Sequence, residues 1–280
     1  MNGMTSEDFL FLARLVRRRA GLTLTDGKGE ALELRLAPVM RRFGFRDLGA
    51  LMKDLRFGYE TLSAAVTEAV TVNETSFFRD PYQFARLEHQ VLPQLLAARA
   101  HEKRLRIWCA ACATGQEAWS LAIMLDAMAP AGWTVELIAT DISGDAIARA
   151  EAGHYSQAEM MRGLPLEDVA RHFRAQERGF TISERLKRMV NFKKFNLLDS
   201  FGWLDDLDLV LCRNVLIHFD RAAKESVLER LAETLSPDGV LLLGEAESVH
   251  PFASLYQELP GGSGLYARAK AQVTRLSTAV

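Results

Sequence analysis

Two acidic residues and one glycine loop have the spacing of a nucleoside-binding site. An apolar run over residues 106–110 ends in small residues, turns at Gly115 and enters an amphipathic stretch with Glu117 in its first turn. A second apolar run over 135–140 ends on Asp141. A carboxylate there can accept hydrogen bonds from both ribose hydroxyls, while small residues let the backbone approach a ligand. The order strand, loop, helix, strand, acid is typical of folds that bind a nucleoside-bearing cofactor.

The first loop departs from the glycine-rich loop that binds dinucleotides. It contains Gly115, but Ala111 and Ala113 stand where further glycines would be expected. A pyrophosphate needs more bare backbone N–H groups than this loop provides. The sequence therefore favours a cofactor without phosphate, such as S-adenosylmethionine, over a dinucleotide.

The cysteines raise the question of a redox or metal site. Cys109 and Cys112 have the Cys-x-x-Cys spacing of redox and zinc sites, but no second Cys/His pair with ligand spacing accompanies them. Both residues lie at the end of a predicted strand, as does Cys212. We therefore expect buried thiols in a reducing cytoplasm and no metal.

Composition narrows the class of protein. The 280-residue chain has 49% hydrophobic residues and a net charge of −2, which argues against a general nucleic-acid binder. No apolar run approaches the ~20 residues of a membrane span, and the N-terminus lacks a basic, apolar leader. We expect a cytoplasmic protein without membrane insertion. Arginines gather at residues 35, 41, 42 and 46, where a solvated helix face and a docking surface remain equally open.

Residues 6 to about 72 predict helices only. Apolar residues recur at helical spacing from Ser6, a predicted N-cap, to Gly21, and again over 28–43, 48–57 (with Asp47 as the cap) and 61–70. We expect a helical N-terminal domain over 1–72. A polar and aromatic segment and a helix over 81–99 then form a connection over 73–103.

From residue 104 onward, strands and helices alternate. Strands are predicted at 105–110, 135–141, 190–195, 207–212 and 239–245, and helices at 116–128, 143–152 and 221–235. Turn residues at 260–264 predict a closing antiparallel hairpin between 252–259 and 265–268. Residues at about 157–190 break the alternation and predict an inserted helix and a short β hairpin. The fold class is therefore α/β, with a doubly wound, mostly parallel sheet over 104–280 and a small inserted β subdomain.

Five motifs in order resemble the chemotaxis receptor methyltransferases, the CheR family. They are TVNETSFFR at 71–79, ATGQEAWS at 113–120, ATDIS at 139–143, FNLL at 195–198 and CRNVLIHFD at 212–220. The resemblance covers nearly the whole chain and implies a class I S-adenosylmethionine-dependent methyltransferase. The implied reaction is methyl esterification of glutamate side chains on the cytoplasmic domain of methyl-accepting chemoreceptors, with S-adenosylhomocysteine as product.

The implied chemistry needs positioning groups more than acid–base groups. A glutamate with a pKa of about 4.3 is already ionised at neutral pH, so no general base is required. A dry site favours an attack that annihilates charge, and alignment can supply roughly 7–11 kcal/mol. The resemblance places Arg79 beside the transferred methyl, where a guanidinium can hold a carboxylate by two hydrogen bonds. A surface arginine at a helix start is the alternative.

The resemblance also implies cofactor contacts. Asn73 and Thr75 match family positions that touch the cofactor, and Glu117 would face its ammonium, unless Glu117 belongs to a capping box. Asp141 would bind the ribose, and Asn196 and Leu197 would flank the adenine. Arg213 and Asn214 follow a predicted strand, at the carboxyl edge of the sheet where such ligands bind.

His218 departs from the family pattern, which has tyrosine there. Histidine can also donate a hydrogen bond near the substrate carboxylate, but it titrates near neutrality. We expect His218 to be a second catalytic residue with a sharper pH dependence, or else to point elsewhere. The substitution also leaves room for a non-catalytic, cofactor-sensing receptor-binding module. A methyltransferase for another carboxylate or for nucleic acid is the third hypothesis.

The resemblance implies that the helical domain docks on the receptor, with Arg35, Arg41 and Arg42 facing its glutamates. In some members the inserted subdomain binds a pentapeptide at the receptor's C-terminus. The hairpin turn at 177–179 is short here, so we expect no pentapeptide tether, which titration calorimetry with such a peptide tests. We further expect a monomer.

Overall fold

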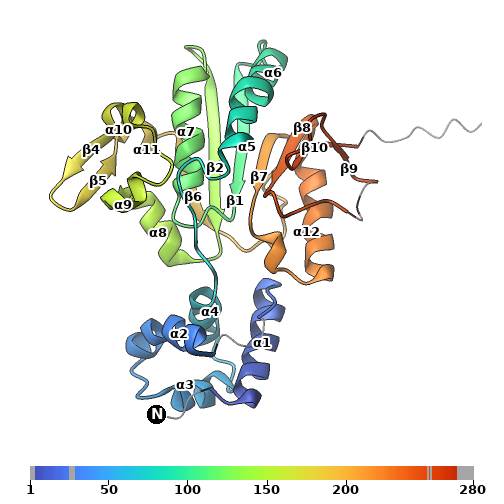
Figure 1. Ribbon diagram of the computed structural model, residues 1–280. Helices are drawn as coiled ribbons and strands as arrows, with labels where there is room; N and C mark the ends of the chain where they lie inside the picture. The colour runs from blue at the N-terminus through green and yellow to red at the C-terminus, as the bar shows by residue number, and fades with distance from the viewer. Residues whose placement is uncertain (1–3, 25–28, 251, 253, 270–280) are drawn as a thin grey trace, which may run out of the picture.

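The computed structural model describes residues 4–24, 29–250, 252 and 254–269. A helical part at the N-terminus lies against one end of a larger α/β part, as Figure 1 shows. The inserted subdomain projects from one side of the α/β part, and the closing hairpin lies on the opposite side.

Four helices form the N-terminal part, as predicted. They are α1 (Ser6–Ala20), α2 (Gly29–Phe43), α3 (Leu48–Leu55) and α4 (Glu60–Ala69). Apolar residues at helical spacing pack into one core, represented by Leu12, Leu36, Leu51 and Val66. Asp47 caps α3 as predicted, but the cap of α1 is Thr5 and not Ser6, because the Thr5 side chain accepts from the Asp8 amide. Residue 28, predicted as helical, lies outside the described residues.

The central sheet contains seven strands in the order β6-β2-β1-β7-β8-β10-β9. The strands are β1 (Arg104–Ala110), β2 (Thr134–Asp141), β6 (Val190–Lys194), β7 (Leu207–Cys212), β8 (Leu235–Leu243), β9 (Tyr256–Glu258) and β10 (Leu265–Arg268). The first five in this order pair in parallel, and the hairpin β9–β10 adds antiparallel to β8. This is the predicted doubly wound architecture. The last parallel strand begins four residues earlier than predicted, at Leu235, across an irregularity in its register with β7.

Successive side chains of the strands pack into two hydrophobic cores, one on each face of the sheet. Ile107 and Cys109 of β1 lie in the core on one face of the sheet, whereas Trp108 and Ala110 lie in the core on the other. This alternation follows from the period of two in a strand. Helices on both faces complete the layers: α7 (Gln116–Met128) and α8 (Gly144–Ala152) contribute to the first core, and α12 (Arg221–Thr234) to the second.

The connecting helix predicted over 81–99 is interrupted. It consists of α5 (Pro81–Arg86), a π-helical turn η1 (Leu87–Val91) and α6 (Leu92–Ala98). Pro93 has no N–H for the carbonyl of His89, and the Leu92 amide reaches back five residues to Leu87. A proline near this point therefore accounts for the break. Among the described residues, no helix combines the length and apolarity needed to cross a bilayer.

The insertion is a small sheet of its own with the order β3-β5-β4. Its strands are β3 (His154–Tyr155), β4 (Phe173–Gln176) and β5 (Gly179–Ile182), and β4 and β5 form the predicted hairpin. The prediction of one inserted helix was wrong, because three short helices are present: α9 (Gln157–Met160), α10 (Leu166–His172) and α11 (Glu184–Lys187). Each spans one or two turns, too short for a recognisable apolar period.

Candidate functional site

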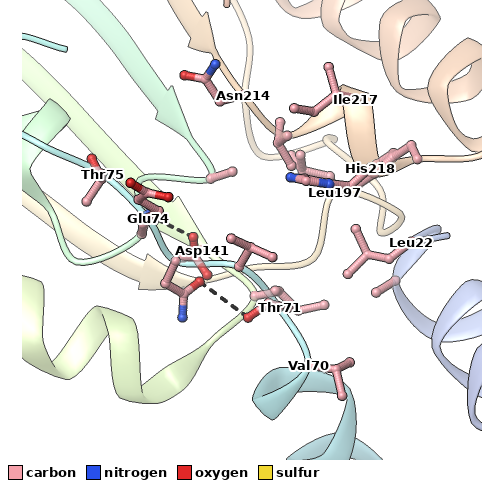
Figure 2. A pocket seen from close by; sticks show the side chains of 18 of the residues that line it. Leu22, Val70, Thr71, Glu74, Thr75, Asp141, Leu197, Asn214, Ile217 and His218 are labelled. Atoms are coloured by element: carbon pink, nitrogen blue, oxygen red, sulfur yellow. Dashed lines mark hydrogen bonds between the residues drawn. The ribbon is translucent and has the colours of Figure 1, made fainter. Parts of the chain in front are cut away.

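A cavity of 510 Å³ opens at the carboxyl ends of the parallel strands, between the sheet and the helical part. Figure 2 shows Asp141 and Asn214 on the sheet side of this cavity, with Leu22 and Val70 approaching from the helical part. Every residue predicted to act in catalysis or cofactor binding lines it: Asn73, Thr75, Arg79, Glu117, Asp141, Asn196, Leu197, Arg213, Asn214 and His218. Five separate segments of the sequence therefore meet at one site.

Asp141 has two free acceptor positions in this cavity. It is buried at the end of β2, where one carboxylate oxygen accepts from the Ala113 amide and the other from the Ser143 amide, both at 2.9 Å. Burial raises the pKa of this carboxyl, and the two backbone N–H groups oppose that rise. Since a carboxylate oxygen has two lone pairs, each oxygen retains one for a ligand hydroxyl. The geometry fits a ribose diol.

The loop after β1 folds tightly through left-handed residues. Ala111, Ala113 and Gly115 all have positive φ, at 58°, 49° and 94°. A Cβ atom on Gly115 would lie 2.7 Å from the Cβ of Ala150 on α8, so only glycine fits there. The backbone at the cavity wall is thereby held between β1 and α8.

Glu117 is buried and is not part of a capping box, because no side chain caps the start of α7. One carboxylate oxygen accepts from the Cys109 thiol at 3.1 Å, and the other forms an ion pair with Arg213. Burial raises the pKa of Cys109, with the Glu117 charge adding to the effect, so this sulfur is a neutral donor. Cys109 therefore helps to orient Glu117.

Arg79 lines the cavity from a tight turn before α5. Its guanidinium donates to the Glu74 carbonyl at 3.1 Å and is partly exposed, so it retains donors that can bind a carboxylate. Arg213, by contrast, has a side chain with no exposed surface, and it donates to four protein acceptors. The two arginines of the site thus differ: one is available to a ligand, and the other is part of the scaffold.

Asn196 and Leu197 both lie at the cavity wall, but only Asn196 is already bound to other parts of the protein. The Asn196 amide already donates to the Arg19 carbonyl at 2.7 Å and accepts from the Leu198 N–H at 3.0 Å. It therefore ties the helical part to the loop after β6. Leu197 is buried and provides an apolar surface of the kind that an adenine ring packs against.

Glu247 is a site residue that the sequence did not reveal. Its carboxylate accepts from the backbone N–H groups of Gly244, Asn214 and Ile217, and so holds the loop that carries Asn214 and His218. In the sequence, Glu247 is only an acid that follows the end of β8. Its place near the cavity depends on the pairing of β8 with β7, which the sequence did not reveal.

The helical part closes one side of the cavity. Leu22 forms an isolated bridge with Phe219, and the Thr23 amide donates to the His218 carbonyl at 2.7 Å. Glu68 of α4 makes a second contact with the α/β part: it accepts from the Gly144 amide of α8 at 2.8 Å and forms an ion pair with Lys194 of β6. Arg35 also lines the cavity and donates to the Val70 carbonyl at 3.0 Å, whereas Arg41 and Arg42 are exposed and lie outside it. Sequence reasoning assigned this part to docking and missed its contribution to the cavity.

The residues present fit S-adenosylmethionine. Asp141 offers acceptors for the ribose, Leu197 an apolar surface for the base, and Glu117 a buried carboxylate for the ammonium. The loop after β1 has the close backbone approach of a nucleoside site but a single glycine.

Comparison with known proteins gives the same assignment. The description "CheR methyltransferase, SAM binding domain" matches residues 73–263, and "CheR methyltransferase, all-alpha domain" matches residues 7–71. Chemotaxis protein methyltransferase 1 of Pseudomonas aeruginosa is 36% identical over 271 residues, which cover 94% of this chain and 98% of that protein. Chemotaxis protein methyltransferase Cher2 of Pseudomonas putida is 32% identical over 270 residues, with the same coverage of both chains. The chain therefore belongs to the CheR methyltransferase family, and the cavity lies within the part that matches the S-adenosylmethionine-binding domain and at its border with the all-alpha domain.

Proposed function

We propose that this protein methyl-esterifies glutamate side chains on the cytoplasmic domain of chemoreceptors; its relatives are named chemotaxis protein methyltransferases. The supporting observation is the arrangement around one cavity: Asp141 and Glu117 suit the cofactor, and Arg79 is a partly exposed guanidinium beside them. A guanidinium at that position suits a carboxylate acceptor and has no evident use for a neutral one.

The residues act by orientation and by exclusion of water. Bound S-adenosylmethionine supplies an activated methyl group on a sulfonium centre. Arg79 holds the acceptor carboxylate by paired hydrogen bonds, and the helical part keeps water from the cavity. The acceptor is already ionised at neutral pH, so no residue has to remove a proton. His218, from the short 3-10 helix η2 (Leu216–His218), lines the same cavity and is proposed to donate a hydrogen bond to that carboxylate.

The test is transfer of radiolabelled methyl to receptor cytoplasmic fragments, with base-labile release of methanol as the readout. We expect base-labile label from the wild type and a loss of about 100-fold or more in kcat for Arg79→Ala. Arg79→Lys keeps the charge but loses the bidentate geometry, and its activity should stay well below that of the wild type. S-adenosylhomocysteine binding, measured by calorimetry, serves as the folding control for both variants.

Two other outcomes would redirect the assignment. Base-stable label would indicate a different acceptor, because esters and not amines or thioethers release methanol in base. Tight S-adenosylhomocysteine binding without any transfer would favour the cofactor-sensing receptor-binding module. His218→Tyr separates these outcomes, since tyrosine should create activity only where histidine alone prevents it.

The position of Arg41 and Arg42 supports docking on an acidic surface. Both are exposed near the end of α2, where two positive charges can face receptor glutamates without entering the cavity. Arg35 is instead proposed to act at the cavity wall. We further propose a cytoplasmic monomer that recognises its receptor without a pentapeptide tether, given the two-residue connection between β4 and β5.

A further inference from the structure

The turn that carries Arg79 has an unusual backbone. The residues on either side of it, Phe78 and Asp80, both have positive φ, at 46° and 59°. Non-glycine residues rarely adopt this conformation, and they keep it only where the surrounding structure enforces it. Two such residues flanking one arginine imply that specific contacts determine the direction of that arginine.

Those contacts come from the cofactor side of the site. Ser120 on α7 accepts from the Phe78 amide at 2.9 Å. On the other side of the turn, one terminal nitrogen of Arg213 donates both to the Arg79 carbonyl and to the Asp80 carboxylate, each at 2.8 Å. The backbone on both sides of Arg79 is therefore held by side chains outside the turn.

The other two nitrogens of the Arg213 guanidinium also have protein acceptors. Its second terminal nitrogen pairs with Glu117, and its Nε donates to Gln83 at 2.8 Å. The guanidinium is planar and rigid, so Glu117 and Asp80 are bound at a set distance from each other. The Arg213 side chain has no exposed surface, so its charge depends on these protein partners for compensation.

We propose that Asp80 is a positioning residue for Arg79, acting through its ion pair with the buried Arg213. In this arrangement the acid of the cofactor site and the turn that orients the acceptor are parts of one hydrogen-bonded unit. The inference rests on the proposed function only in assigning the acceptor to Arg79; the geometry of the turn stands independently of it.

Three variants test the proposal in the full-length protein. Asp80→Gly removes the carboxylate but accepts the positive φ without strain. Asp80→Asn keeps an oxygen acceptor and also tolerates this conformation. Asp206→Gly is the matched control, because Asp206 is exposed, has a φ of 49° and lies outside the cavity.

We expect Asp80→Gly to lower kcat on receptor fragments by about 100-fold, as a misplacement of about 1 Å can. Its affinity for S-adenosylhomocysteine should fall far less than kcat, because Arg213 keeps its ion pair with Glu117. Asp80→Asn should recover most of the loss, and Asp206→Gly should behave as wild type. A wild-type kcat in Asp80→Gly, or a loss of kcat matched by an equal loss of S-adenosylhomocysteine affinity, would overturn the proposal.

A crystal structure of Asp80→Gly with S-adenosylhomocysteine provides a readout that does not depend on the acceptor. We expect the Arg79 backbone to shift or to adopt several conformations, and an unchanged turn would reject the proposal. If the wild type gives no base-labile label while the turn of the variant moves, the proposed function fails and the positioning role stands. If the wild type and Arg79→Ala behave as proposed while the turn of Asp80→Gly stays unchanged, the proposed function stands and the positioning role of Asp80 fails.

Discussion

Individual residues of this site are specialised by their surroundings more than by their type. Arg79 and Arg213 have the same side chain, yet one is partly exposed and the other is fully enclosed by protein acceptors. Asp141 and Glu117 are both buried acids, but Asp141 accepts from backbone N–H groups whereas Glu117 is held by a thiol and a guanidinium. The donors around Asp141 are thus part of the backbone, whereas those around Glu117 are side chains that mutation can remove.

The raised pKa of Asp141 predicts a pH-dependent affinity for S-adenosylhomocysteine. Only the ionised carboxylate accepts from both ribose hydroxyls, and burial makes Asp141 take up a proton at a higher pH than an exposed aspartate does. Affinity should therefore fall as the pH is lowered through the raised pKa of Asp141, and binding at low pH should release up to one proton.

Calorimetry at several pH values, in buffers of different ionisation enthalpy, measures this effect. Asp141→Ala should bind weakly and without this pH dependence. An affinity that stays constant down to the acid limit of folding would show that the ribose does not depend on this carboxylate.

At the scale of elements, the loop between β1 and α7 depends on its contact with α8. Gly115 lies against Ala150, and the Trp119 indole donates to the Ala150 carbonyl at 3.3 Å. Position 115 therefore requires both a positive φ and the absence of a Cβ atom. Comparison with a glycine that has positive φ but open space around it separates these two requirements.

Gly115→Ala should destabilise the protein more than Gly132→Ala. Both glycines have positive φ, which costs an L-residue about 1–2 kcal/mol, but Gly132 has open space around it. The clash with Ala150 should add roughly 1–3 kcal/mol at Gly115 and displace the cavity wall. Urea unfolding measures the free-energy difference, and only Gly115→Ala should also lose S-adenosylhomocysteine affinity. Equal stability of the two variants would mean that the loop relaxes without cost.

For the whole molecule, the cavity is complete only when the helical part lies against the sheet. Besides the Asn196 amide, which donates to the Arg19 carbonyl, two sets of contacts hold it there. The segment around Leu22 pairs with residues 218–220, and Glu68 on α4 reaches the start of α8 and the end of β6. We therefore expect the affinity for ligand to depend on these contacts between the two parts, although the contacts themselves do not involve the ligand.

Glu68→Ala should weaken S-adenosylhomocysteine binding by about tenfold, since a hydrogen bond to a charged group contributes about 1.5–3 kcal/mol. Glu60→Ala is the control, because Glu60 lies on the same helix but pairs with Arg19 inside the helical part. Dissociation rates from stopped-flow measurements should rise in Glu68→Ala alone. Equal rates in both variants would show that closure does not depend on the Glu68 contacts.

Local patterns in the sequence determined most of the fold. The parallel strands β1, β2, β6 and β7 and the helices α7, α8 and α12 lie within about two residues of their predicted bounds, because apolar periodicity is a local property. A small-residue loop and an acid at a strand end predicted a nucleoside site, the family resemblance added further residues, and all ten line one cavity. The predictions were less accurate where elements are short, as in the insertion, or where one proline interrupts a helix, as in η1.

Only the tertiary structure decided which polar groups pair with one another. Arg213 joins Glu117 to Asp80, Glu247 supports the loop of Asn214, and Glu68 closes the helical part onto α8. These partners are separated by between 33 and 133 residues. Their pairing depends on strand order and on helix packing, and neither leaves a periodic signal in the chain. Local apolar patterns therefore specify the elements and the polar residues at their ends, whereas the packing of those elements specifies which of these residues line the cavity and which support the others.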